Sequence, residues 1–220
     1  MKLGGKYRHD IMCPITERVG MGFQPGDDVL VLCPQFGGDE SRACIDLLTP
    51  VEPQEVNALA VLFMQSPSDH LSAWQRHAGA YPARSHIVSV DADARSSAAM
   101  TDAETAVEDR AIERVNSPQN LTQLGVRIAD CLEEWDESDT DRQIVCCFRS
   151  VSTLLQYVDL DQAFRFLRVV TDRCADVDAL SHYHLNPRAH DEQTVATLTE
   201  LFDAVLEYDG DDWTAHRSNW

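Results

Sequence analysis

The sequence predicts a doubly wound α/β domain, with a mostly parallel sheet of about six or seven strands and helices on both faces. Short apolar runs alternate along the chain with amphipathic segments of helical period, which is typical of a parallel sheet covered on both sides. At 220 residues, 44% of them hydrophobic, the chain is long enough to bury one substantial core. It contains no internal repeat, so we expect a single domain.

The first half of this domain is expected to hold three strands and two helices. The expected strands are residues 29–33, 59–64 and 87–90, and the expected helices are residues 40–48 and 66–79. The run VLVLC follows a turn and has the length and composition of a buried strand. The second helix starts at Ser66-Pro67 and ends at Gly79, because proline is favoured in a first helical turn and glycine just beyond the last.

The second half repeats this alternation after a polar excursion. The expected strands are residues 144–148, 179–185 and 204–208, and the expected helices are residues 117–135, 161–174 and 191–202. Apolar residues recur every three or four positions in the first of these helices, as an amphipathic helix requires. Residues 91–115 are rich in Ala, Asp, Ser and Glu and poor in large apolar groups, so we expect a loop there.

Two end segments flank the domain. We assign residues 1–20 to an N-terminal extension, residues 21–210 to the domain and residues 211–220 to a C-terminal tail. The tail carries Trp213 and Trp220, two large apolar side chains in an acidic chain. It could dock on a partner, fold back on the domain or be disordered.

The charge of the chain is strongly acidic. Thirty-seven Asp and Glu residues face 18 basic residues, for a formal net charge of −19, and Lys2 and Lys6 are the only lysines. Self-repulsion at this charge strains a compact domain in dilute buffer, but at about 1 M salt the Debye length falls to roughly 3 Å. The composition therefore resembles that of halophilic archaeal proteins.

Composition also excludes several classes of function. Phosphate-backbone binding needs clustered Lys or Arg, and here the arginines are scattered among acids, so we expect no nucleic-acid partner. The chain shows neither a leader nor an apolar run of membrane-spanning length, which predicts a cytoplasmic protein without membrane insertion. Its seven cysteines form no CxxC pair, and we expect buried, reduced thiols.

The order of elements and several segments resemble the RecA/KaiC-like P-loop ATPase family. The resemblance covers roughly residues 20–210 and is closest to short haloarchaeal proteins described as transducer-like or as uncharacterised relatives of KaiC. The segments that carry it are VLVLCPQFGG, LAVLFMQSPSDHL, NSPQNLTQLGVRI, IVCCFRSVSTLLQYVD and HDEQTVATLTELFDAVLEYD. It implies the fold of that family, with a nucleotide site at the carboxyl edge of the sheet.

The phosphate-binding loop of that family is degenerate here. A P-loop, GxxxxGK[ST], needs its lysine to neutralise the β- and γ-phosphates and its hydroxyl to hold Mg²⁺. The corresponding stretch is Cys33-Pro34-Gln35-Phe36-Gly37-Gly38-Asp39-Glu40-Ser41. Gly38 is retained, but Asp39 takes the lysine position and Glu40 the hydroxyl position, and Ser41 brings no lysine with it. At ~4 Å and an effective dielectric constant of about 20, each repelling charge is worth about 4 kcal/mol.

Two further positions of the family's active site have also changed. The metal-holding acid at the end of the fourth expected strand is replaced by Arg149, which Ser150 follows. The water-activating glutamate after the second strand is replaced by Gln65, which can orient water but cannot accept its proton. We therefore predict no ATPase activity. We expect Asp39 and Arg149 to form an ion pair in the vacated site, on neighbouring central strands.

Histidines and a cysteine offer an alternative chemistry. His182 and His184 alternate on an expected strand and face the same way, and His190 in the following loop is a conceivable third metal ligand. Cys33 ends the first strand before a helix start and is a candidate nucleophile or redox sensor, although nearby carboxylates oppose its ionisation. The competing interpretation makes these residues structural.

The sequence thus favours a non-catalytic signalling or regulatory module without a cofactor. Its expected partners are proteins, such as catalytically intact KaiC-like relatives or a component of a sensory pathway, and homo-oligomers are plausible. Two alternatives stay open: a nucleotide-binding sensor that does not hydrolyse ATP, and a metal- or thiol-dependent enzyme.

Overall fold

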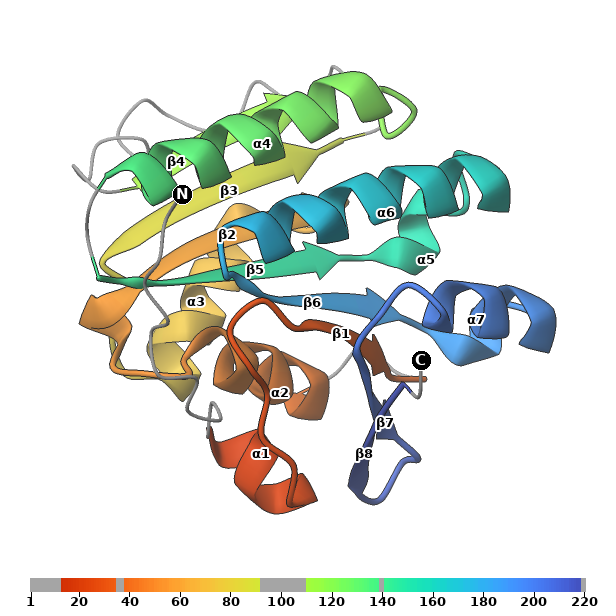
Figure 1. The fold of residues 1–220 in the computed structure, drawn as a ribbon, viewed down its shortest axis with the longest axis horizontal. Coiled ribbons are helices and arrows are strands. Elements are labelled where there is room, and N and C mark those ends of the chain that lie inside the picture. The colour runs from red at the N-terminus through yellow and green to blue at the C-terminus, as the bar shows by residue number, and fades with distance from the viewer. Residues whose placement is uncertain (1–12, 35–37, 92–109, 139–140, 219–220) are drawn as a thin grey trace.

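One mixed sheet organises the chain, in a computed structural model that describes residues 13–34, 38–91, 110–138 and 141–218 (Figure 1). Within these residues the sheet has eight strands in the order β4-β3-β2-β5-β6-β1-β7-β8. The strands are β1 (Asp28–Leu32), β2 (Val56–Phe63), β3 (Arg84–Val90), β4 (Arg110–Val115), β5 (Gln143–Arg149), β6 (Leu180–Leu185), β7 (Ala204–Tyr208) and β8 (Trp213–Arg217). All neighbours are parallel except β7 and β8, which are antiparallel.

Helices cover both faces of this sheet. They are α1 (Pro14–Val19), α2 (Gly38–Leu48), α3 (Pro67–His77), α4 (Leu121–Glu137), α5 (Val151–Leu154), α6 (Leu160–Asp176) and α7 (Glu192–Thr199), with short 3₁₀ turns η1 (Pro53–Glu55) and η3 (Pro187–Ala189). One face packs against α4 to α7 and the other against α1 to α3 (Figure 1). The predicted α/β class with a mostly parallel sheet is confirmed, whereas the sheet has more strands than the six or seven expected.

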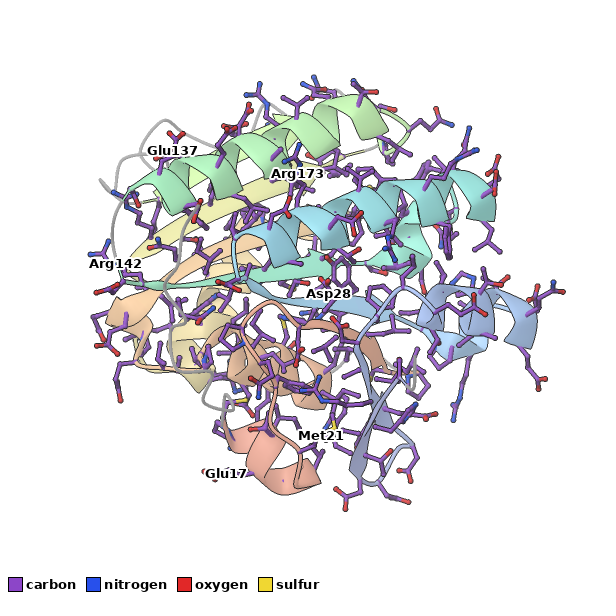
Figure 2. All side chains as sticks on the ribbon, viewed as in Figure 1. Glu17, Met21, Asp28, Glu137, Arg142 and Arg173 are labelled. Carbon is purple, nitrogen blue, oxygen red and sulfur yellow. The ribbon has the colours of Figure 1, made fainter. Side chains whose placement is uncertain are left out.

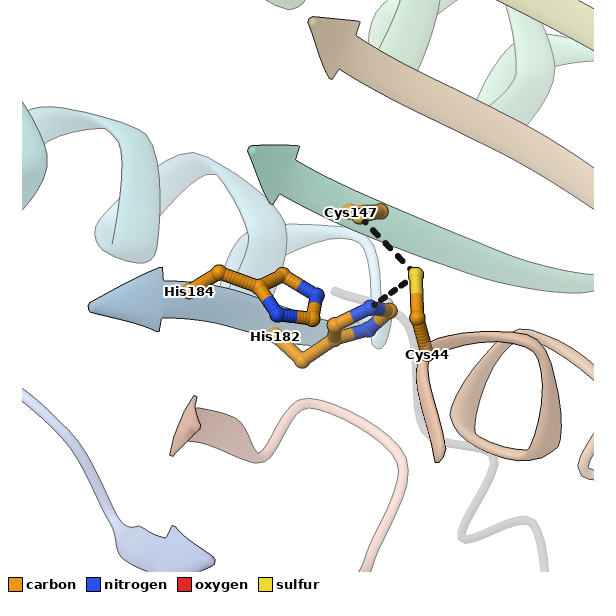
Figure 3. A group of neighbouring side chains, drawn as sticks. All are labelled: Cys44, Cys147, His182 and His184. Atoms are coloured by element: carbon orange, nitrogen blue, oxygen red, sulfur yellow. Dashed lines mark hydrogen bonds between the residues drawn. The ribbon is translucent and has the colours of Figure 1, made fainter. Parts of the chain in front are cut away.

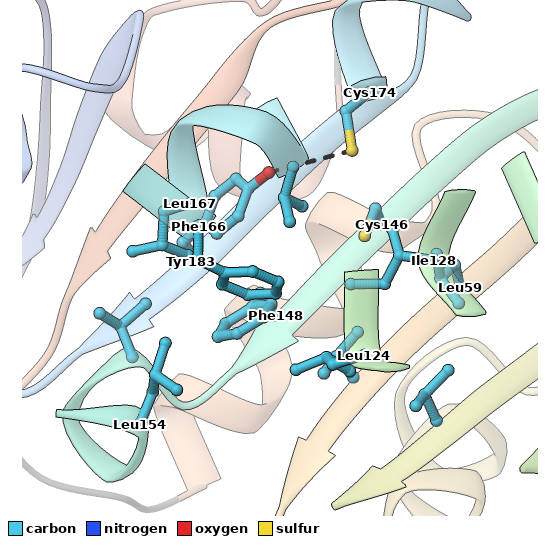
Figure 4. Close-up of a cluster of buried hydrophobic side chains, with 14 of the residues drawn as sticks. Leu59, Leu124, Ile128, Cys146, Phe148, Leu154, Phe166, Leu167, Cys174 and Tyr183 are labelled. Carbon is cyan, nitrogen blue, oxygen red and sulfur yellow. Dashed lines mark hydrogen bonds between the residues drawn. The ribbon is translucent and has the colours of Figure 1, made fainter. Parts of the chain in front are cut away.

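The core forms two layers because successive strand residues point to opposite faces. Leu30 and Leu32 of β1 belong to the layer under α4 to α7, and Val29 and Val31 to the layer under α1 to α3. Figure 4 shows the first layer, where Phe148 of β5 stacks on Tyr183 of β6 at 5.9 Å between ring centroids. Burial on both faces explains why these strands are continuous apolar runs.

The edge strand β4 was missed by the prediction. Residues 91–115 were expected to be a loop, but Arg110–Val115 form β4, parallel to β3. Its side chains are mostly half-exposed, and an edge strand with one neighbour needs fewer apolar residues than a central strand. Residues 92–109 lie outside the described part of the chain.

The described parts of the two end segments pack on the domain. The tail contributes β8, where Trp213 is buried and its ring lies 5.0 Å from that of Tyr208. From the N-terminal extension, α1 packs against both α2 and β8. Nη2 of Arg18, in the last turn of α1, lies 3.0 Å from Oδ1 of Asp212. Residues 213–217 therefore extend the sheet beyond β7, and residues 14–19 pack against that added strand.

Charged side chains of α4 and α6 point toward solvent. Glu137 on α4 and Arg173 on α6 are both exposed (Figure 2). Among the described residues, each helix is too short or too polar to cross a lipid bilayer.

The net charge of −19 predicts a folded state that salt stabilises. We expect the melting temperature to rise as KCl increases from 0.1 to about 2 M, because the Debye length falls from about 10 Å to below 3 Å and self-repulsion is screened. Thermal unfolding followed by circular dichroism measures this, with sucrose as the control for excluded-volume stabilisation. A melting temperature that is constant or falls with KCl would contradict the halophilic interpretation.

Candidate functional site

Three pairs of polar side chains converge between α2 and the sheet, towards the carboxyl ends of the central strands. They are Glu40 and Cys44 of α2, Cys147 and Arg149 of β5, and His182 and His184 of β6. Each pair shares one face of its element, because helix residues four apart and strand residues two apart point the same way. One member of each pair therefore lies at the carboxyl edge of the sheet and the other lies deeper. The edge layer consists of Glu40, Arg149 and His184, and the deeper layer consists of Cys44, Cys147 and His182.

The edge layer is a buried ion-pair network. Nη2 of Arg149 lies 3.1 Å from Oε2 of Glu40, and Nδ1 of His184 lies 2.9 Å from Oε1 of the same carboxylate. Glu40 and His184 are each 1% exposed, and Arg149 is 8% exposed. Burial acts to lower the pKa of His184, but the negative charges of Cys44 and Glu40 outweigh it and raise that pKa. Glu40 is thus held between two cationic groups.

Arg149 forms an ion pair with an acid that the sequence did not single out for it. Among the described side chains its partner is Glu40 of α2. Asp39, the expected partner, precedes Glu40 in the same helix, and its side chain lies outside the described part of the structure, so the pair of Asp39 with Arg149 stays a prediction. The expectation that β1 and β5 are neighbours was wrong, because β6 lies between them. Glu40 reaches Arg149 because the inward face of α2 extends across β6.

The deeper layer combines two thiols and an imidazole (Figure 3). Sγ of Cys44 lies 3.4 Å from Sγ of Cys147 and 3.3 Å from Nε2 of His182. Cys147 and His182 are directly opposite each other in the β5–β6 ladder. The rings of His182 and His184 meet edge to face, 5.1 Å apart. The side chains of Cys44, Cys147, His182 and His184 are each at most 1% exposed.

Burial and these contacts shift the titration of the deeper groups. The hydrogen bond with Cys147 lowers the pKa of the Cys44 thiol well below its usual value, with the two imidazoles adding to this effect against burial. Burial raises the pKa of the Cys147 thiol and lowers that of His182. His70 of α3, also buried, has a pKa lowered to about 4, chiefly by burial. The deeper layer thus contains an acidic Cys44 thiol beside the neutral imidazole of His182.

The structure separates the three histidines that the sequence grouped. His190 lies outside the cluster, and its Nε2 contacts Oγ of Ser152 at 2.9 Å. The third and fourth positions beside His182 and His184 are taken by Cys44 and Cys147 instead. The reason is geometric: the loop after β6 leads away into η3 and α7, whereas α2 lies over the strand.

The remaining predicted residues are outside the cluster or outside the described part of the chain. Gln35 and Gly37 are among the residues that the structure does not describe. Cys33 is buried just after β1, where its amide donates to the carbonyl of Leu185, and it is not part of the cluster. The others are placed as follows: Ser41 is half-buried in α2, Gln65 is half-buried after β2, and Ser150 is buried at the start of α5, where its hydroxyl accepts a hydrogen bond from the amide of Thr153.

The sequence contained a partial signal for the residues that were missed. Cys44 shares the apolar side of its helix with Leu47 and Leu48, and Cys146 and Cys147 are adjacent in one strand and so point to opposite faces. Which of these two cysteines shares a face with His182 depends on the strand order and on the face that α2 covers. That information comes only from the tertiary structure, so the pairing of Cys44 with Cys147 was not predictable.

Comparisons with known proteins add a family but no activity. No curated protein matches the chain. The model of one protein family matches residues 26–208, a span that runs from the turn before β1 to the end of β7 and includes every residue of the cluster. The chain therefore belongs to DUF7504, a family of unknown function.

Proposed function

We propose that this protein is a non-catalytic regulatory module with a RecA/KaiC-like fold. The observation that carries the proposal is the network of Glu40, Arg149 and His184 at the carboxyl edge of the central strands. In open α/β sheets, ligands bind in the crevice outside this edge, next to strands whose connections leave in opposite directions. Here β1 connects through α2 on one face and β6 through α7 on the other.

The chemistry of the network opposes triphosphate binding. A P-loop offers backbone amides, a lysine and a hydroxyl to phosphate and Mg²⁺. In this chain Glu40 places a buried negative charge at the start of the corresponding helix. Arg149, the cation that could compensate, is already neutralised by that carboxylate at 3.1 Å. A γ-phosphate would have to break this ion pair and leave Glu40 buried without its partner, which is costly.

Two cavities among the described residues lie away from this network. A groove of about 590 Å³ runs between α4 and α6 on the outside of the molecule, and a smaller cavity of about 240 Å³ lies beside α1. Neither of these two cavities is lined by Glu40, Arg149 or His184. The groove between α4 and α6 offers an outer surface for contact with a partner.

A phosphate-release assay tests the absence of catalysis. In about 2 M KCl with Mg²⁺ and millimolar ATP, we expect the protein to release phosphate no faster than buffer, because Gln65 stands in place of the family's carboxylate base and Asp39 in place of its lysine. A P-loop ATPase that is active at the same salt concentration serves as the positive control. Release that is proportional to protein concentration and lost in Arg149→Met would overturn the proposal.

A nucleotide sensor without hydrolysis is the second candidate. It is favoured by Arg149, a guanidinium at the edge where the fold places ligands. In this candidate the Glu40 carboxylate turns away and a phosphate takes its place on the guanidinium. The two candidates differ in nucleotide affinity: the sensor binds without dependence on Mg²⁺, and the closed module does not bind.

A further inference from the structure

The three residues of the deeper layer, together with His184 of the edge layer, have the composition of a metal site. Four ligand atoms, from Cys44, Cys147, His182 and His184, lie within 4.8 Å of one another. They come from one helix and two adjacent strands, so their backbone positions are fixed by the core rather than by loops. We propose that these four residues bind a structural zinc ion. This inference goes beyond the proposed function and does not depend on it.

The distances between the ligand atoms are close to those of tetrahedral zinc. Zn–S bonds of about 2.3 Å and Zn–N bonds of about 2.0–2.1 Å place neighbouring ligand atoms roughly 3.3–3.8 Å apart. The Cys44–Cys147 sulfur separation is 3.4 Å, and Nε2 of His182 lies 3.3 Å from Sγ of Cys44. The full set of four atoms lies within 4.8 Å, so binding an ion requires the widest pair to close by roughly 1 Å. Two sulfurs with two imidazoles are a common ligand set of structural zinc.

His184 is oriented as a metal ligand by the edge layer. Its Nδ1 contacts Oε1 of Glu40, whose other oxygen contacts Arg149, so Nε2 is the nitrogen left for the cluster. Both ring nitrogens of His184 are buried and form no hydrogen bond among the described residues, so Nδ1 has only its 2.9 Å ionic contact with Glu40 and Nε2 is free to bind an ion. Zinc-bound histidines characteristically give their second nitrogen to a carboxylate, which fixes the ring and increases its basicity. The edge network and the deeper cluster therefore form one continuous assembly.

Charge and burial indicate a structural rather than a catalytic ion. Two thiolates neutralise Zn²⁺, so the complex brings no net charge into a site where all four ligands are at most 1% exposed. A catalytic zinc keeps one position open for water or substrate, whereas here four protein ligands fill the tetrahedron. The ion would tie α2 to β5 and β6, the elements that also carry the edge layer.

Metal analysis of the purified protein tests the site. The protein is prepared in molar KCl with a reductant, and its zinc content is measured by inductively coupled plasma mass spectrometry. We expect about one zinc per chain in the unmodified protein and loss of that zinc in Cys44→Ala and Cys147→Ala. Cys146→Ala is the matched control, because Cys146 is equally buried on the same strand but points to the opposite face. It should retain zinc.

The ligand set is tested without relying on variants that must fold. X-ray absorption at the zinc edge of the unmodified protein should show two sulfur and two nitrogen neighbours. Glu40→Gln keeps the volume of the side chain but loses its charge, and should weaken zinc retention against a chelator by about 10–100-fold. A protein that holds no zinc as purified and takes up no Co²⁺ on refolding would overturn the proposal. A Cys44–Cys147 disulfide, or equal zinc in Cys44→Ala, would do the same.

Discussion

Arg149→Met should lower the free energy of unfolding by about 3–5 kcal/mol. The substitution keeps much of the side-chain volume but removes the guanidinium that lies 3.1 Å from Glu40. Glu40 then stays buried with His184 as its remaining cationic neighbour. Breaking a buried ion pair by removal of one partner is one of the few causes of losses this large. Urea unfolding in about 2 M KCl measures the effect under conditions that keep the acidic surface screened.

A double variant separates the ion pair from the general effect of a core substitution. Glu40→Gln together with Arg149→Met removes both charges, and buried ion pairs replaced on both sides are often nearly neutral in stability. We therefore expect the double variant to be more stable than Arg149→Met alone. Arg168→Met is the control, because Arg168 pairs with Asp172 on the exposed side of α6 and should cost about 1 kcal/mol or less. Additive losses from the two single variants would contradict a coupled pair.

Asp28 should make the protein less stable as the pH rises. This carboxyl is 4% exposed at the start of β1, and the hydroxyls of Ser181 and Tyr183 both donate to Oδ1. Burial raises its pKa to about 8, with the charges of Asp203 and Asp27 adding to the rise and the two hydrogen bonds opposing it. The folded state therefore binds a proton that the unfolded chain releases near pH 4.

The sign of the pH dependence follows from proton linkage. Between about pH 4 and pH 8 the folded state binds more protons than the unfolded state, so stability falls as the pH rises. The stabilisation is fully present below the unfolded pKa and is lost as the pH rises through the folded pKa. The slope contributed by one such group approaches about 1.4 kcal/mol per pH unit.

Asp28→Asn isolates this contribution. The amide keeps the shape of the neutral carboxyl but does not titrate, so the difference in stability between Asp28→Asn and the unmodified protein should favour the variant increasingly from pH 5 to pH 8. Urea unfolding at constant KCl across this range measures the difference. Asp161→Asn is the control, because the Asp161 side chain is 80% exposed, and it should preserve the slope of the unmodified protein. A pH-independent difference for Asp28→Asn would contradict a buried neutral carboxyl.

Much of the sheet could be predicted because its central strands are buried on both faces. Continuous apolar runs such as VLVLC and IVCCF mark β1 and β5 without knowledge of their neighbours. The edge strands β4 and β8 gave no such signal. β4 has one neighbour and mostly half-exposed side chains, and β8 is a mostly polar strand that pairs with β7 and buries Trp213 in the core layer under α1 to α3.

The candidate site was predictable in composition but not in pairing. The replacements at Asp39, Glu40 and Arg149 were visible against the pattern of an ATP site, and an ion pair of Arg149 with an acid at the sheet edge followed from their charges. The sequence did not single out Glu40 as the partner, because neighbouring helix residues point in directions about 100° apart and the face of α2 that meets β5 depends on the tertiary structure. The contact between Cys44 and His182 depends on the position of β6 between β1 and β5, and no local sequence pattern encodes that strand order.

The central claim is that the edge network closes the crevice in which this fold would hold a nucleotide. Isothermal calorimetry with ATP in about 2 M KCl, with and without Mg²⁺, tests it most directly. We predict no binding up to millimolar ATP under either condition. Binding that requires Mg²⁺ would contradict the claim and restore an ATPase interpretation, and binding without Mg²⁺ that Arg149→Met abolishes would show a nucleotide sensor with an open crevice.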